Sequence, residues 1–182
     1  MSTAFSTWTR ALPVALLCVW LAILAGCGSV AQTTRLEPGF VPQKTFSVTV
    51  GDITSESPPV PDDEKVELDP LQALRTALTK KLAEHEIPSV PSSTGAQYVL
   101  VSTIREYRPG SAFKRWLMPG YGSTILWVES ELREGDKKVA ESSNKRTVDA
   151  GGAYTAGAYE SIFADVAGDI VVGLKEKLAA GQ

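Results

Sequence analysis

The segment from residue 158 to residue 180 places an apolar side chain at every fourth position, and this spacing constrains the fold more than any other feature. The side chains concerned are Ile162, Val166, Ile170, Leu174 and Leu178. Residues four apart lie on one face of a helix, so the segment predicts an amphipathic helix of about twenty residues. Because such a helix must bury its apolar face, we expect it to lie on a sheet.

Four other segments alternate apolar and polar residues, which is typical of half-buried strands. They span residues 44–53, 97–107, 123–134 and 137–150. Gly135 and Asp136 separate the last two segments and predict a hairpin with a short turn.

A second helix is expected over residues 70–85. Asp69 is suited to cap its first turn, Pro70 fits the first helical position, and Pro88 follows its end. The leucines recur at spacings of three and four: Leu71, Leu74, Leu78 and Leu82. The order strand, helix, three strands, helix predicts an α+β fold, with a mostly antiparallel four-stranded sheet and two helices packed on one face.

The N-terminus has the pattern of a secretory signal. Residues 1–10 carry Arg10 and the amino terminus, and residues 11–24 form a continuous apolar core. A membrane-spanning helix needs roughly 20 apolar residues. Residues 11–31 just supply that length, so an uncleaved anchor is the alternative.

Residues 24–27, with the sequence Leu-Ala-Gly-Cys, resemble the lipobox of bacterial lipoproteins. The resemblance implies cleavage between Gly26 and Cys27, a diacylglyceryl group on the Cys27 thiol, and an acyl group on the new amino terminus. One acyl chain binds a membrane only reversibly, whereas three anchor a protein durably. The chain then divides into a signal peptide (1–26), a lipidated cysteine with a tether (27–43), and a single α+β periplasmic domain (44–182).

The residue after the cysteine bears on which membrane, inner or outer, the lipoprotein is sent to. In enterobacterial lipoproteins an aspartate there resembles a retention signal for the inner membrane. Gly28 occupies that position, which favours the periplasmic face of the outer membrane.

The formal net charge is −3, and all charged residues after Arg10 lie beyond residue 34, so the main part of the chain is acidic. We therefore expect no nucleic-acid partner.

The sequence has few groups suited to catalysis. It lacks a G-x-S-x-G elbow, a phosphate-binding P-loop and paired cysteines at metal spacing. Glu129 and Glu131 share a strand face and are the only candidate acid/base pair, although alternating acids are usually solvated. His85, the only histidine, is expected to sit at a helix C-terminus. The sequence thus predicts no enzyme, no metal and no cofactor.

Two loop segments invite other functions. Gly151, Gly152 and Gly157 could be taken for a phosphate cradle, but the G-x-G-x-x-G pattern is absent and we expect a strand-to-helix turn. Residues 54–70 are rich in acids and proline, yet they lack the ordered oxygen spacing of a calcium loop. We expect this acidic segment to be solvated.

Residues 108–124 combine aromatic and basic side chains between glycines and prolines, and long loops of this kind commonly bind partners. The candidate partner-binding residues are Arg115, Trp116, Leu117 and Tyr121. Beside a membrane, the same side chains suit the headgroup region. Alternatively, Trp116 and Leu117 fold back onto the sheet and leave Lys114 and Arg115 in solvent.

Together, these features resemble the domain of unknown function 4410 family of bacterial lipoproteins. The features are the lipobox at Cys27, the step from Arg115 to Gly122, the strand beginning at Ile125, and Gly151-Gly152 before the last helix. Met118-Pro119 departs from the family pattern, and the family implies no activity. We expect a non-enzymatic envelope lipoprotein that binds a partner or itself. The alternatives are a subunit of an oligomeric envelope or secretion assembly and a cell-wall enzyme.

Overall fold

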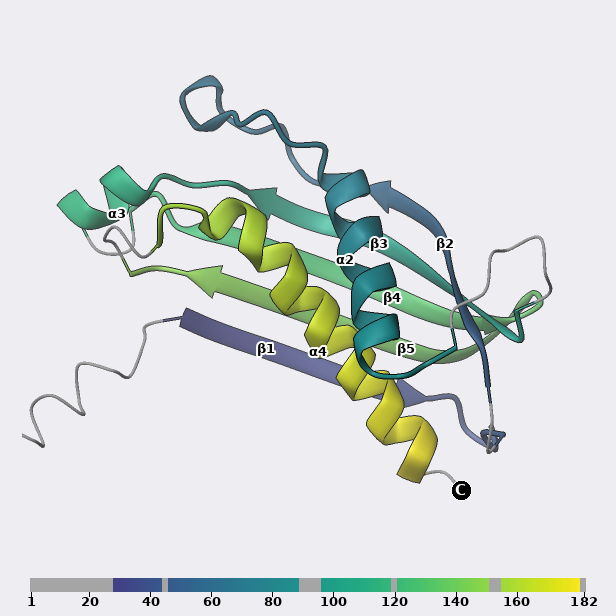
Figure 1. The fold of residues 1–182 in the computed structure, drawn as a ribbon. Coiled ribbons are helices and arrows are strands. Elements are labelled where there is room, and N and C mark those ends of the chain that lie inside the picture. Colours follow the sequence, from purple (N-terminus) through teal and green to yellow (C-terminus); the bar gives the residue numbers. More distant parts are fainter. Residues whose placement is uncertain (1–27, 44–45, 89–95, 119–120, 151–154, 181–182) are drawn as a thin grey trace, which may run out of the picture.

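The computed structural model describes residues 28–43, 46–88, 96–118, 121–150 and 155–180. Figure 1 shows two long helices lying across one face of a single sheet. In spatial order the five strands are β1 (Gly28–Leu36), β5 (Lys137–Val148), β4 (Thr124–Glu134), β3 (Tyr98–Arg108) and β2 (Val48–Ser55). All neighbouring strands are antiparallel except β2 and β3, which are parallel.

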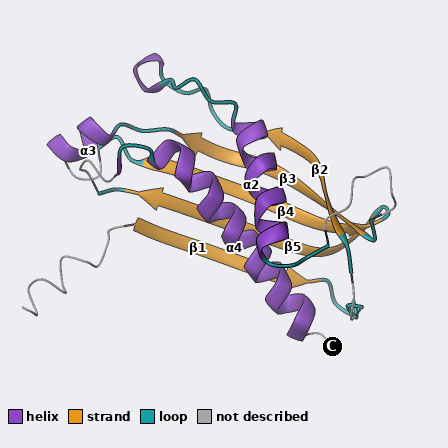
Figure 2. Cartoon of the chain, in the orientation of Figure 1, coloured by secondary structure: helices purple, strands orange, loops and turns teal. Residues whose placement is uncertain are grey.

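Figure 2 shows the helices that connect or follow these strands. Helix α2 (Pro70–Glu84) joins the two parallel strands, which need a long crossover, and α4 (Ala158–Ala180) ends the described chain. Short helix α3 (Ala112–Leu117) connects β3 to β4, and the 3-10 turn η2 (Asp62–Glu64) precedes α2. None of the helices in the described residues has the length and apolar character needed to cross a bilayer.

The core lies between the two long helices and the sheet. The expected α4 stripe is buried throughout, together with Phe163 and Val171. It packs on α2 and on alternating side chains of the central strands, among them Leu100, Leu126 and Leu132. The α+β class and the placement of both long helices on one face are therefore confirmed.

The ends of α2 also form as the sequence predicts. The carboxylate of Asp69 accepts hydrogen bonds from the backbone N–H groups of Leu71 (2.9 Å) and Gln72 (3.3 Å). Pro70 is the first helical residue, and His85 is the C-terminal cap. Gly135 turns between β4 and β5 with a positive φ of 59°, a conformation that glycine adopts at little cost.

The sheet has one strand more than the sequence predicts. Residues 28–36, expected to belong to a tether, form β1 and pair with β5 over their whole length. On the helix-covered face β1 makes polar contacts, because the Gln32 side-chain amide donates to the Asp169 carbonyl (2.8 Å) and the hydroxyls of Thr34 and Ser142 are bonded (3.2 Å). Residues 28–36 are thus part of the sheet and not of a tether.

Gly173 on α4 provides a test of this strand. A Cβ atom at Gly173 would lie 2.5 Å from Thr34 Oγ1 and 2.8 Å from Gln32 Nε2, so it would push β1 away. We expect Gly173→Ala to lower the free energy of unfolding by about 1–3 kcal/mol, measured by urea denaturation of the full chain. Gly168→Ala is the control: its Cβ would meet only the Lys81 side chain, at 3.7 Å or more, and helix propensity should stabilise it by roughly 0.5–1 kcal/mol. Equal effects would contradict close packing of β1 on α4.

Candidate functional site

The connection between β3 and β4 is folded tightly against the end of the sheet. The N–H of Ser111 donates to the Gly122 carbonyl (2.8 Å), and the Ser111 hydroxyl caps α3 by accepting from the N–H of Lys114 (3.3 Å). Gly110 and Gly122 both have positive φ values, 64° and 76°. At Gly110 a Cβ atom would collide with the backbone of the returning segment, so glycine is needed there.

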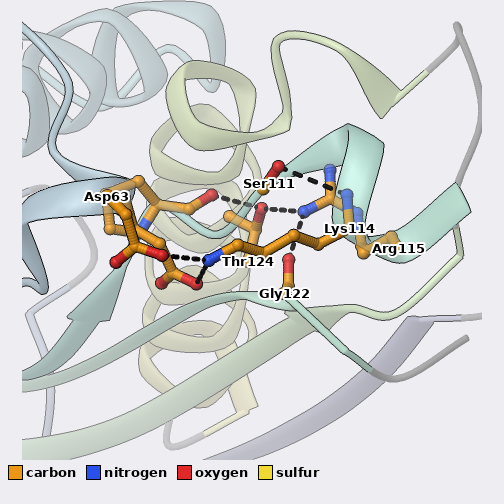
Figure 3. Close-up of polar contacts among 8 residues, drawn as sticks. Asp63, Ser111, Lys114, Arg115, Gly122 and Thr124 are labelled. Carbon is orange, nitrogen blue, oxygen red and sulfur yellow. Dashed lines mark hydrogen bonds and ion pairs between the residues drawn. The ribbon is translucent and has the colours of Figure 1, made fainter. Parts of the chain in front are cut away.

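Arg115 is the centre of this structure, because its side chain is buried with only 2% of its surface exposed. Its guanidinium donates to the carbonyl oxygens of Ala150 (3.1 Å), Gly122 (2.9 Å) and Thr155 (3.1 Å) and to the hydroxyl of Thr124 (2.8 Å). Figure 3 shows the bonds to Gly122 and Thr124. One side chain thus ties α3 to the start of β4 and to the segments before and after residues 151–154.

The burial of Arg115 corrects the expectation that it stands in solvent or meets a partner. Burial lowers the pKa of Arg115, and the charge of Asp149 opposes this effect. The guanidinium nevertheless stays charged at neutral pH, and its hydrogen-bonding groups are turned to backbone oxygens. Arg115 therefore positions the loop and has no surface left for recognition.

The other candidate side chains point outward. Five large apolar side chains on and beside α3 are each 57–68% exposed, and we call them the α3 surface: Phe113, Trp116, Leu117, Met118 and Tyr121. The rings of Phe113 and Trp116 lie 6.1 Å apart. The alternative in which Trp116 and Leu117 fold back onto the sheet is wrong. Helical spacing explains the outcome, since residues 113, 116 and 117 share one face and residue 115 lies opposite.

Lys114 holds α3 from the other side. Its ammonium group lies 2.6 Å from the Asp63 carboxylate and 3.1 Å from that of Glu64, both in η2 (Figure 3). The hydrogen bond from Lys114 lowers the pKa of Asp63, and the same bond raises the pKa of Lys114. The acidic segment is therefore not merely solvated as expected: part of it fixes α3. The sequence gives no signal for this contact, since the partners are 50 residues apart.

Glu129 and Glu131 lie on the sheet face that the helices leave open. Glu129 is ion-paired with Arg105 (2.7 Å) and Glu131 with Arg133 (2.5 Å). They border a shallow depression of about 340 Å³ that Thr33 and other polar side chains also line. Each carboxylate is thus held by an arginine, and the geometry gives no support to an acid/base pair. Within the described ranges, no three His, Cys, Asp or Glu side chains are grouped to hold a metal ion.

Some of the predicted features lie outside the described residues. These are the signal peptide with the cleavage site Gly26-Cys27 and the paired glycines Gly151-Gly152. Cleavage and lipidation at Cys27 stay predictions.

No known family and no curated protein matches the sequence. The fold, however, is similar to solved structures. A chain of the PelC dodecamer from Paraburkholderia phytofirmans is 16% identical, with a TM-score of 0.51 over 81% of this chain and 97% of that chain. A Xanthomonas campestris protein of the domain of unknown function 330 family is 13% identical, with a TM-score of 0.47 over 82% and 97%. A candidate lipoprotein from Caulobacter crescentus is 16% identical, with a TM-score of 0.34 over 70% and 88%.

At this level of identity, the similarity to PelC shows a shared fold. The membership in the 4410 family predicted from the sequence is not shown by any of these comparisons.

The buried guanidinium yields a stability prediction. Arg115→Ala removes the hydrogen bonds of the guanidinium to three carbonyls and a hydroxyl, so we expect it to lower the free energy of unfolding by about 3 kcal/mol. Arg115→Lys should lose less, because an ammonium group replaces only some of the bonds. The control is Arg133→Ala, which removes an exposed ion pair and should cost less than about 1 kcal/mol. If urea unfolding gave Arg115→Ala and Arg133→Ala the same stability, Arg115 would not organise the loop.

Proposed function

We propose that this chain is a lipid-anchored lipoprotein of the bacterial cell envelope that works by docking and not by catalysis. The α3 surface is the observation that carries this proposal. Of the seven large apolar side chains that are strongly exposed among the described residues, five belong to it. Such a cluster on a folded domain is typical of an interaction site. Arg115 and Lys114 bond α3, which carries three of the five side chains, to the rest of the domain.

The anchor in this proposal is Cys27. The signal core and lipobox precede it, and Gly28 follows it, which favours the periplasmic face of the outer membrane. In the structure β1 begins at Gly28 and is paired with β5 over its whole length. A lipid on Cys27 would therefore be joined directly to a folded domain.

An enzyme that acts on the cell wall is the weaker reading. It would rest on Glu129 and Glu131 alone, and each of these carboxylates is ion-paired with an arginine. We therefore propose no catalytic residues.

The anchor is tested by removing the Cys27 thiol. Cys27→Ala removes the group that would carry the lipid, so we expect the chain to remain uncleaved and to lack diacylglyceryl. Cys18→Ala is the matched control, because Cys18 lies in the apolar core of the signal and should not affect processing. The measurement is the mass of the full chain recovered from the bacterial membrane fraction. A wild-type mass without lipid, or normal processing of Cys27→Ala, would contradict the proposal.

A subunit of an oligomeric assembly is the second candidate function, and the free edge of β1 favours it. Among the described strands β1 pairs only with β5, so the opposite edge of its nine residues is unpaired. A regular unpaired edge is a template for pairing with another chain. The structure of similar fold from Paraburkholderia phytofirmans is a dodecamer, which supports self-association.

A charge on this edge strand should weaken such assembly. Ala31 is exposed in β1, and a lysine there should disfavour strand pairing between chains. We expect wild-type chain in detergent to exceed the mass of a monomer by light scattering, and Ala31→Lys to shift toward the monomer. Ala179→Lys, at an exposed position near the end of α4, is the control and should change nothing. A monomeric wild-type chain would exclude the assembly role.

A further inference from the structure

We propose that the α3 surface enters the lipid interface of the membrane that carries the anchor. This inference rests on the proposed function, because it names the partner of the same docking surface. It is carried by the position of α3 relative to the first residue of the domain.

Strand register places α3 and the domain's N-terminus at the same end of the sheet. Gly28, the first residue of β1, is paired with Val148, and Val148 is paired with Thr124, the first residue of β4. Arg115 of α3 bonds the Thr124 hydroxyl at 2.8 Å. Figure 1 shows this arrangement, with α3 and the start of β1 at one end and the end of α4 at the other.

The distances involved are short. Two strand spacings, about 10 Å, separate Gly28 from Thr124. Cys27 is one peptide unit before Gly28, so their Cα atoms are about 3.8 Å apart. Because residue 28 is already part of the sheet, no flexible segment separates a lipid on Cys27 from this end of the domain. The anchor therefore brings the α3 surface to the bilayer.

The chemistry of the surface fits the interface. Tryptophan and tyrosine are enriched at headgroup level, and Trp116 and Tyr121 supply both. Phe113, Leu117 and Met118 add apolar area that gains free energy in contact with acyl chains. The charge of Lys114 is compensated by two carboxylates of η2, so attraction to anionic headgroups contributes little. We expect contact with zwitterionic lipid that is insensitive to salt.

The chain carries its own reporters for this test. Trp8 and Trp20 precede Cys27, which leaves Trp116 and Trp127 after cleavage. Trp127 is on the open sheet face, where its indole N–H donates to Ser143 (3.1 Å). The full chain is reconstituted into phosphatidylcholine vesicles whose acyl chains carry bromine, which quenches tryptophan only at close contact. The matched variants are Trp116→Phe and Trp127→Phe.

We expect bromine to reduce the fluorescence of the wild type and of Trp127→Phe, with a shift to shorter emission wavelength. Trp116→Phe should lose that quenchable component. Addition of 0.5 M salt, which shortens the Debye length to well under about 10 Å, should not change the result. An equal response of wild type and Trp116→Phe would overturn the inference. So would capture of only protein, and no lipid, by a photoreactive residue at position 116 in cells, because it would assign the surface to a protein partner.

The mass of the same sample separates this inference from the proposed function. If the chain carries lipid but Trp116 is not quenched, the anchor is supported and contact of the α3 surface with the membrane is refuted. A chain without lipid refutes the anchor. In that sample the difference between wild type and Trp116→Phe still decides whether the α3 surface meets lipid, because it isolates the signal of that one residue.

Discussion

Burial of the apolar stripe of α4 is the constraint on which the rest of the fold depends. This helix contacts α2 and the strands β1, β4 and β5, so it links α2 to the part of the sheet that includes β1. Ile162, Val166 and Ile170 are fully or almost fully buried along it. The sheet face that the helices do not cover is polar and carries ion pairs, so the described domain has one core. That uncovered face can be exposed to solvent.

A second level of organisation is polar and local. The guanidinium of Arg115 gathers backbone oxygens from three separate segments at the end of the sheet. The apolar side chains of α3 point away from the core, so packing of α3 does not hold these segments together. The hydrogen bonds of the buried Arg115 guanidinium therefore hold α3 on the domain in place of apolar packing. The apolar side chains of α3 can then remain exposed.

Periodicity predicted both long helices and four of the strands, because each buries a regular apolar face. It failed for β1, where Gln32 and Thr34 face the helices and bond to them through polar groups. Near α3, the residues selected from the sequence include Trp116, Leu117 and Tyr121, which are exposed, but also Arg115, which is buried. The acceptors of the Arg115 guanidinium are mainly backbone carbonyls, two of them more than 30 residues away along the chain. Backbone carbonyls are present at every residue, so they leave no pattern in a sequence. The helical spacing of residues 113, 116 and 117 was the available signal.

The direction of α4 has a consequence for how far the domain extends. This helix begins next to the segment bonded by Arg115 and runs to the opposite end of the sheet (Figure 1). Its 23 residues span about 35 Å. With the α3 end at the lipid, the β4–β5 hairpin and the end of α4 would lie up to that distance from the bilayer surface, so the length of one helix limits how far the domain extends.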